Sequence, residues 1–517
     1  MLIKYSVLAL YFGILFLIGI FASKKIKTMS DFFVGGKKLG YWVVAFSARA
    51  TGESAWLILG LTGMGALMGL KAMWVVAGEV LGVFLCWFFM AKPFKKFTDQ
   101  HNSITIPDYL VSRFKSSTNH LRALSAFILT VFMTIYISAQ IDATGSAFET
   151  FFQWNYFTGV LVGFGIVVFY IFAGGFVAVA WSDLFQGIMM LLGLVLLPIV
   201  GYFSLDKFGK TEGLFNGLAS IDPGLISFLG ADGLSLINIM TIIGFLMIGI
   251  GFLGSPQIFV RFMSISDETE INKGRWVAIA FTILTDTAAV FAGMIGRYLL
   301  SVPGETAVNT FGNGAQNVLP LLVENVMPSI LVAIYIAVVL SAIMSTIDSL
   351  LVVSSSALTR DYYQQIINPN TTQEKMASLS RNITLSLAVI ALLISISIAI
   401  ISPNRTIFWF VIFGWSGISA SFCPMMILSI FWKKYNEKGA IASMITGFLA
   451  VPLFKFVIPN INIIGPYFEA LSELPPSFFL SFIVGYIVTN LTHNTSFYEK
   501  SLSTISYEKR QLIKQKK

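Results

Sequence analysis

Charged residues are scarce in this chain. Only 12% of its 517 residues are Asp, Glu, Lys or Arg, whereas 56% are hydrophobic. Soluble domains carry about 25% charged and about 45–50% apolar residues, so this amount of charge is too small to cover a globular surface of this size. The shortage excludes soluble enzymes, nucleic-acid-binding proteins and disordered scaffolds. It predicts that much of the surface faces a lipid bilayer.

Cysteine and histidine are rare as well. The two cysteines, Cys86 and Cys423, both lie in apolar runs, so no disulfide framework is indicated. The three histidines lie outside the cores of the hydrophobic runs and form no metal-ligand or nucleophile constellation. Hydrolysis inside a membrane would need such groups. We therefore expect neither an enzyme nor an enzymatic cofactor.

Long hydrophobic runs, in contrast, are abundant. A helix that crosses a bilayer needs about 20 apolar residues. We therefore predict an all-α polytopic membrane protein with about 13 transmembrane spans, at approximately 4–23, 41–69, 72–91, 123–150, 156–178, 183–203, 235–260, 275–300, 327–356, 381–401, 406–431, 438–458 and 475–492. The first run is too long for the core of a signal peptide, so we expect it to be retained as a span.

The basic residues indicate an orientation. Most of the 34 Lys and Arg, Arg122 and Arg261 among them, fall in loops after odd-numbered spans or in the segment 494–517. Cytoplasmic loops carry the excess of basic residues. This pattern predicts a transmembrane domain over 1–493 with its N-terminus outside, followed by a basic cytoplasmic tail.

Two of the predicted spans contain helix-breaking sequences. The second span includes ARATGES at 48–54, and the seventh has three glycines before Ser255 and Pro256. Gly and Pro inside a span free backbone groups that lipid cannot satisfy. Transporters use such broken helices to bind ions and substrates at the bilayer midplane, at corresponding positions of two repeats. Breaks five spans apart indicate a repeat of five spans.

The ninth span carries a polar face. Ser345, Asp348 and Ser349 have the spacing i, i+3 and i+4, which places them on one side of a helix. A carboxylate in a span is costly and is functional by default, and hard alkali cations prefer oxygen ligands. Asp183, which we expect at the head of the sixth span, is the natural second carboxylate.

Other intramembrane charges permit more than one interpretation. Arg49 and Glu53, at i and i+4, either neutralise each other or take a direct part in binding, with the guanidinium receiving a substrate carboxylate. We expect Glu79, Asp286 and Arg297 to have structural or interfacial roles.

Several motifs follow one another along the chain: DFFVGGK at 31–37, TIPDY at 105–109, WSD at 181–183, Pro256 with RFM at 261–263, and MSTIDSLL at 344–351. In this order they resemble the motifs of the sodium/solute symporter family, most closely its sodium/proline symporter branch. The resemblance runs from about Tyr5 to Lys455. It implies a leucine-transporter-like fold, with spans 2–6 (about 41–203) and 7–11 (about 235–431) as inverted repeats. It also implies a multi-pass protein of the bacterial inner membrane in which sodium drives alternating access.

The resemblance also implies sodium ligands. For the family's shared sodium site they are the backbone carbonyls of Ala50, Glu53 and Ala342 and the hydroxyls of Ser345 and Thr346. A possible second sodium ion nearer the cytoplasm would use Ser345, Asp348, Ser349 and Asp183.

The substrate pocket departs from the branch pattern. Gly52 stands where the proline branch has Asp, Ile248 and Phe252 stand where it has Trp and Tyr, and Arg49 stands where it has Gly. The full set of expected substrate-binding residues is Arg49, Ser54, Trp56, Tyr136, Gln140, Ile248, Phe252, Ser255 and Pro256. The resemblance implies import of proline or a related small carboxylated solute.

Other functions fit the sequence too. Relatives elsewhere in the family carry sugars, sialic acid, pantothenate or short monocarboxylates. A transporter-derived membrane sensor belongs to a different class, although no signalling domain follows residue 493. The partners we expect are a small-molecule solute, sodium and the lipid bilayer, with no nucleic acid and no obligatory protein partner.

Overall fold

The computed structural model describes residues 2–24, 28–171, 175–301 and 306–492. Within these ranges the chain is helical, and the one β-type pairing is an isolated bridge between Leu39 and Ile265. The predicted basic tail at 494–517 lies outside the described residues.

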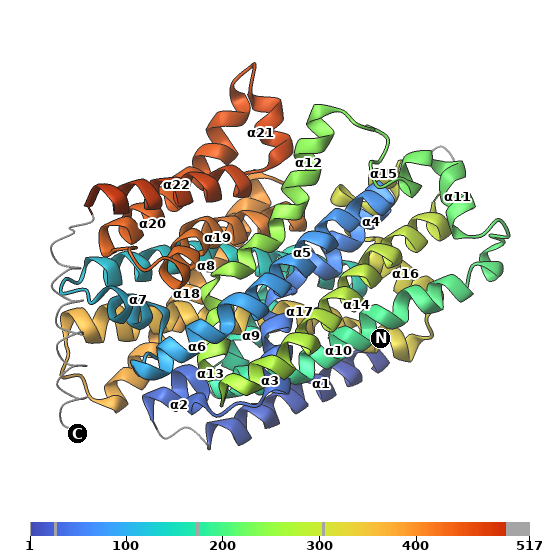
Figure 1. The fold of residues 1–517 in the computed structure, drawn as a ribbon. Helices are drawn as coiled ribbons and strands as arrows, with labels where there is room; N and C mark the ends of the chain where they lie inside the picture. The colour runs from blue at the N-terminus through green and yellow to red at the C-terminus, as the bar shows by residue number, and fades with distance from the viewer. Residues whose placement is uncertain (1, 25–27, 172–174, 302–305, 493–517) are drawn as a thin grey trace.

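The first part of the chain runs through ten α-helices (Figure 1). They are α1 (Leu2–Ser23), α2 (Met29–Val34), α3 (Tyr41–Gly52), α4 (Thr62–Met68), α5 (Met73–Leu85), α6 (Ala91–Gln100), α7 (Ile106–Phe114), α8 (His120–Phe152), α9 (Tyr156–Ile171) and α10 (Gly175–Phe203). A π-helical turn, η2 (Trp56–Leu61), joins the break after α3 to α4, and a second, η4 (Cys86–Met90), extends α5.

The second part continues with twelve more. They are α11 (Leu214–Ile221), α12 (Leu236–Met247), α13 (Pro256–Ser264), α14 (Glu268–Leu300), α15 (Ala307–Phe311), α16 (Val318–Val326), α17 (Ser329–Ser356), α18 (Gln373–Ile401), α19 (Ile407–Phe431), α20 (Glu437–Pro452), α21 (Gly465–Leu471) and α22 (Leu474–Thr492). A 3₁₀ segment, η7 (Ile248–Leu253), follows α12, and a π-helical segment, η9 (Ala357–Ile367), extends α17.

Within the described residues, each predicted span overlaps helical structure. Among the described residues, 11 helical segments are long and apolar enough to cross a membrane. This number is smaller than the predicted 13 because α3 and α9, with 12 and 16 residues, are shorter than the roughly 20 residues that a bilayer span needs. The second half of the second span also runs on into α5 as one helical stretch, Trp56–Gln100.

The boundary between the fifth and sixth spans was predicted wrongly. The helix α9 ends at Ile171 and α10 begins at Gly175, not near residue 183. Gly175 has a φ of +55°, a conformation that costs glycine little, and hydropathy does not reveal a turn inside an apolar run. Asp183 therefore lies two turns inside α10 rather than at its head.

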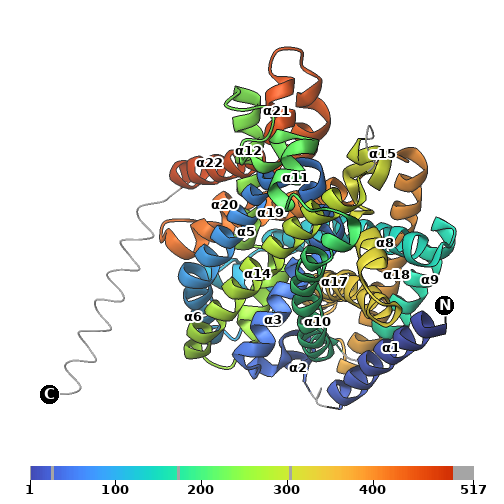
Figure 2. The same cartoon turned by 90° about the vertical axis from the view of Figure 1, so that its right-hand side faces the viewer.

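The helices divide into an inner group and a peripheral group. In the most apolar stretch of each helix, 83% of the residues are buried in α17 and 89% in α19, but only 28% in α1 and in α20. In Figure 1, α2, α6 and α7 lie at one end of the bundle, and α11 and α15 lie at the opposite end (Figures 1 and 2). The loops predicted to be cytoplasmic and the stretches predicted to be external are thus at opposite ends.

Candidate functional site

The second predicted span is interrupted in the middle of the bundle. The helix α3 ends at Gly52, and the Glu53 amide closes it with a hydrogen bond of 2.8 Å to the Arg49 carbonyl oxygen. Helical conformation returns at Ser54, and the π-helical turn η2 begins at Trp56. The break falls where the sequence predicted it: Glu53 alone leaves the helical pattern, and the Ala55 amide beside it donates to the side chain of Gln140.

The seventh predicted span is interrupted as well. The helix α12 tightens into η7, the chain is extended at Ser255, and α13 restarts with Pro256 in its first turn. The segment η7 packs closely on α5. A Cβ atom at Gly249 would overlap the carbonyl oxygen of Gly78. Glycine is therefore required sterically where the broken span meets its neighbour.

The helix α17 joins the break in α3 through two hydroxyl groups. The Ser345 hydroxyl donates to the carbonyl oxygens of Ala50, at 3.0 Å, and Ala342, at 3.2 Å. The Thr346 hydroxyl lies 3.1 Å from the carbonyl oxygens of both Thr51 and Ala342. Four of the five residues predicted to bind sodium are therefore adjacent, and the carbonyl of Thr51 joins them.

This group has the chemistry that a sodium ion needs. Every polar atom in it is a neutral carbonyl or hydroxyl oxygen, the ligand type that hard cations prefer. The backbone carbonyl of Glu53, the fifth predicted ligand, is not among the oxygens that Ser345 and Thr346 contact, and the Glu53 side chain forms an ion pair with Arg49. The two hydroxyls would have to turn their lone pairs toward an ion in place of their present hydrogen bonds.

The residues predicted for a second sodium ion meet around an arginine. The Asp183 carboxylate accepts hydrogen bonds from Ser47, at 2.6 Å, and from Arg261 Nη2, at 3.0 Å. The same Arg261 nitrogen contacts the Ser349 hydroxyl, which lies 2.8 Å from that of Thr51. A guanidinium thus links Asp183 on α10 to Ser349 on α17, and Asp348 is also fully buried on α17.

Arg261 was predicted as a charge of a cytoplasmic loop, and that prediction was wrong. Its side chain is 1% exposed, in α13, and it donates to Ser47, Gln257 and Asp183. Arg261 is part of the RFM motif, but its contacts with Ser47 and Asp183 become visible only where α13 packs near α3 and α10.

The expected substrate-binding residues gather between the two breaks. The Tyr136 hydroxyl of α8 donates to Ser54 Oγ at 3.3 Å, and the Trp56 indole donates to the Gly52 carbonyl oxygen at 2.9 Å. The Gln140 side-chain oxygen accepts from the Ala55 amide at 3.1 Å. All of these side chains are buried, so a solute can reach them only after surrounding helices move.

The η7 side of this region contains an aromatic residue that sequence reasoning missed. Trp415 of α19 packs its ring 5.1 Å from that of Phe252 and 6.4 Å from that of Tyr136, and its indole donates to the Ile248 carbonyl oxygen. The Ser255 hydroxyl donates to the Gly251 carbonyl oxygen at 2.6 Å, while Pro256 begins α13. Nothing in the spacing of α19 marks Trp415, because its partners lie far away in the sequence.

Arg49 is already engaged by protein groups. Its guanidinium forms an ion pair with Glu53, lies 3.8 Å from the Glu79 carboxylate and stacks 4.6 Å from the centre of the Phe252 ring. The interpretation in which Arg49 pairs with Glu53 is therefore the one that the contacts support.

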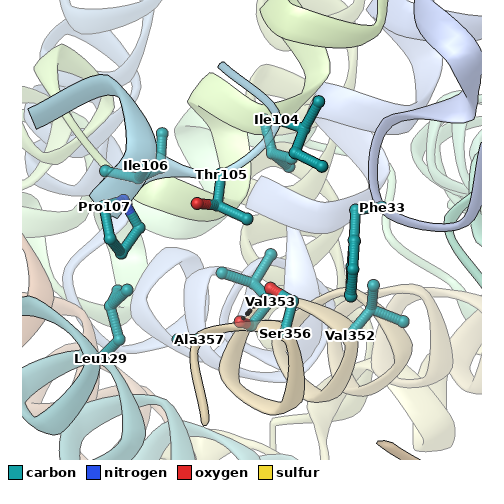
Figure 3. A pocket seen from close by; sticks show the side chains of 11 residues that line it. Phe33, Ile104, Thr105, Ile106, Pro107, Leu129, Val352, Val353, Ser356 and Ala357 are labelled. Carbon is teal, nitrogen blue, oxygen red and sulfur yellow. Dashed lines mark hydrogen bonds between the residues drawn. The ribbon is translucent and has the colours of Figure 1, made fainter. Parts of the chain in front are cut away.

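The end of the bundle that carries α2 and α7 is closed by polar contacts beside a small apolar pocket. Figure 3 shows this pocket, with Phe33 on one side and Pro107 and Leu129 on the other. Next to it, the Thr105 hydroxyl donates to Asp361 at 2.9 Å, and Arg122 pairs with the same carboxylate. Arg122, another predicted loop charge, thus ties α8 to η9.

Comparison with a solved structure identifies the fold. The chain aligns with the substrate-bound outward-open state of a Na⁺-coupled sialic acid symporter with a TM-score of 0.74 at 19% identity, covering 95% of this chain and 98% of that one. The fold is therefore the leucine-transporter-like one.

Sequence comparisons identify the family. The sodium:solute symporter family profile matches residues 32–447. The high-affinity proline transporter PutP of Bacillus subtilis (strain 168) is 33% identical over 485 residues, covering 93% of this chain and 96% of PutP. The sodium/proline symporter of Staphylococcus aureus (strain JH9) is 33% identical over 513 residues, covering 97% and 95%. The chain belongs to the sodium:solute symporter family. It is a multi-pass membrane transporter, and its relatives are transporters rather than enzymes.

Proposed function

We propose that this protein imports proline, or a related small carboxylated solute, together with sodium by alternating access. Family membership supports sodium-coupled solute symport, and the proline transporters to which the chain is similar align over more than nine-tenths of its length. The particular solute is argued from the site.

The observation that carries this proposal is an unpaired donor at the break in α3. The Gln140 Nε2 is buried and has no hydrogen-bond partner, although the oxygen of the same amide is satisfied by Ala55. Buried donors are nearly always paired. A solute carboxylate would accept from Gln140 Nε2 and from the hydroxyls of Ser54 and Tyr136, with the rings of Phe252 and Trp415 enclosing its apolar part.

In the proposed mechanism, sodium bridges α3 and α17 through the oxygens of Ala50, Ala342, Ser345 and Thr346. The bound ion fixes the broken end of α3, so that the donors at residues 54–55 hold their binding geometry. The membrane potential favours entry of the ion by about 2.3 kcal/mol per charge per 100 mV. Release to the cytoplasm requires that the contacts of Arg122 and Thr105 with Asp361 separate.

The further parts of the proposal are topological. Spans 2–6 and 7–11 form the two inverted repeats, the N-terminus lies outside, and the segment 494–517 lies in the cytoplasm. A second sodium ion at Ser345, Asp348, Ser349 and Asp183 is a separate proposal, and it requires Arg261 to give up its present contacts with Asp183 and Ser349.

The test is uptake of radiolabelled proline into proteoliposomes with and without an inward sodium gradient. We expect sodium-dependent accumulation that unlabelled proline abolishes. Gln140→Leu should raise the KM for proline by about tenfold, equivalent to about 1.4 kcal/mol, whereas Gln364→Leu, outside the site, should leave it unchanged.

Absence of proline uptake would overturn the solute assignment. If sodium still raised the Tm of the same preparation, the search would move to the other solutes carried in the family. Sialic acid, sugars, pantothenate and monocarboxylates would then be tested as labelled substrates.

A further inference from the structure

Three carboxylates from three different spans meet beside the break in α3. Glu53 follows α3, Glu79 lies on α5 and Asp286 lies on α14, and one carboxylate oxygen from each lies within 4.8 Å of the others. All three side chains are at most 1% exposed. Its oxygens are different atoms from the carbonyl and hydroxyl oxygens that we assign to sodium.

Arg49 compensates only part of this negative charge. With all three carboxylates ionised, one guanidinium leaves the group with two uncompensated negative charges. Cys86 of η4 is a further titratable group within electrostatic range of Arg49, and η7 contributes the uncharged ring of Phe252. Uncompensated charge inside a bilayer costs several kcal/mol. The group therefore calls for added positive charge.

Carboxylate oxygens and a guanidinium nitrogen in this group lack hydrogen-bond partners. Asp286 Oδ2 and Glu79 Oε2 have no hydrogen-bond partner, although Arg49 Nη2 lies 3.8 Å from Glu79 Oε2 and the other Asp286 oxygen accepts from Thr285 at 3.0 Å. On the cationic side, Arg49 Nε is buried and also has no partner. Most buried polar atoms in folded proteins are paired. Several buried polar atoms without a hydrogen bond in one place are the pattern expected where a small cation binds.

We propose that Glu53, Glu79 and Asp286 bind a monovalent cation, Na⁺ or H⁺, between α3, α5 and α14. The donors are all oxygens, which suits a hard cation, and Arg49 in the same group opposes an ion of higher charge. One Na⁺ with one protonated carboxyl, or two protonated carboxyls, makes the group neutral.

The position gives this cation a role in transport. It lies directly after Gly52, at the broken end of α3, and Arg49 carries the contact onward to Phe252 of η7. Binding would hold the break in α3 against α5 and α14, while the oxygens on α17 hold it from another side. The inference concerns cation binding and does not depend on which solute is carried.

The test uses Tm, so that it is independent of transport. Ser345→Ala removes a ligand of the α17 site and serves as the background. In purified protein at constant ionic strength, Tm is measured with Na⁺ replacing N-methylglucamine at pH 8, and again in N-methylglucamine at pH 6. We expect S345A to gain at least about 2 °C from Na⁺ or from acid. A response to Na⁺ identifies the alkali ion, and a response to acid alone identifies the proton.

The decisive comparison is with the double variant S345A/D286N. It should lose that gain, and its Tm in N-methylglucamine at pH 8 should exceed that of S345A because an uncompensated charge has been removed. S345A/D232N is the matched control, since the Asp232 side chain is 64% exposed and pairs with Lys71, and it should keep the gain.

Three outcomes would overturn the proposal. They are an undiminished gain in S345A/D286N, no response of S345A to either cation, and a lower Tm for S345A/D286N than for S345A without Na⁺ at pH 8. Glu79→Gln in the same background provides the second variant should Asp286→Asn fail to fold, and the same results are expected of it.

Discussion

The ring of Phe252 fills the space into which a side chain at Gly52 would project. A Cβ atom at residue 52 would lie 2.9 Å from Phe252 Cε1 and 3.8 Å from Arg49 Nη1. Two departures from the proline-branch pattern, Gly52 and Phe252, are therefore one steric arrangement shared by the two broken spans.

This relationship predicts that Gly52→Ala destabilises the protein. Overpacking a dense core costs about 1–3 kcal/mol, so Tm should fall. Phe252→Leu should relieve the overlap, and the double variant should lose less stability than the two single variants together. Gly13→Ala on α1, where a Cβ meets nothing within 4 Å, should leave Tm unchanged or slightly raised. Strictly additive losses at residues 52 and 252 would contradict the coupling.

The proposed sodium site predicts a selective effect of Ser345→Ala. Loss of this oxygen should raise the sodium concentration for half-maximal uptake by about tenfold, equivalent to about 1.4 kcal/mol. The KM for solute at saturating sodium should change much less. Ser354→Ala is the control on the same helix, because that hydroxyl donates to the Leu350 carbonyl oxygen of its own helix. Equal shifts in both constants, or no shift in either, would argue against the site.

The contact between Asp183 and Arg261 predicts strong coupling in stability. Removing one partner of a buried ion pair leaves an unpaired charge and costs about 3–5 kcal/mol, so Asp183→Asn and Arg261→Gln should each lower Tm markedly. The double variant removes both charges and should lose less than the sum. The measurement is a double-mutant cycle of the wild type, the two single variants and the double variant. If the losses in stability are additive, the two side chains are not coupled.

The possible second sodium ion predicts a change in stoichiometry with Asp348→Asn. Asp348 is fully buried between Ser345 and Ser349 on α17, and neutralising it would remove the charge that holds the ion. Parallel fluxes of labelled sodium and solute should then show one sodium fewer per solute, while Asp232→Asn leaves the ratio as it was. Full activity with an unchanged ratio would remove this second ion from the mechanism.

Much of the architecture could be predicted from local sequence. The spans follow from runs of apolar residues, because each transmembrane helix must satisfy its own backbone inside lipid. The breaks near Gly52 and before Pro256 follow from residues that cannot continue a helix. The polar face at Ser345 and Ser349 follows from helical periodicity. The turn at Gly175 was missed, since no change of hydropathy marks it.

Partners that are distant in sequence could not be predicted in this way. Arg261 had the sequence context of a loop charge, but α13 carries it inward to Asp183. Glu79 and Asp286 had no visible relation to Glu53, and Trp415 had none to Phe252. Each of these contacts depends on how two or three helical segments that are distant in sequence pack together, which no local pattern encodes.

The sequence by itself determined that this protein is a multi-pass helical symporter with two broken spans, because hydropathy, helix breakers and motif order are local properties. The tertiary structure decided which charges face each other. It placed Arg261 between Asp183 and Ser349, and it brought three carboxylates together around Arg49. The physical reason is that charges inside a bilayer are stable only beside specific partners, and those partners are fixed by packing between helices.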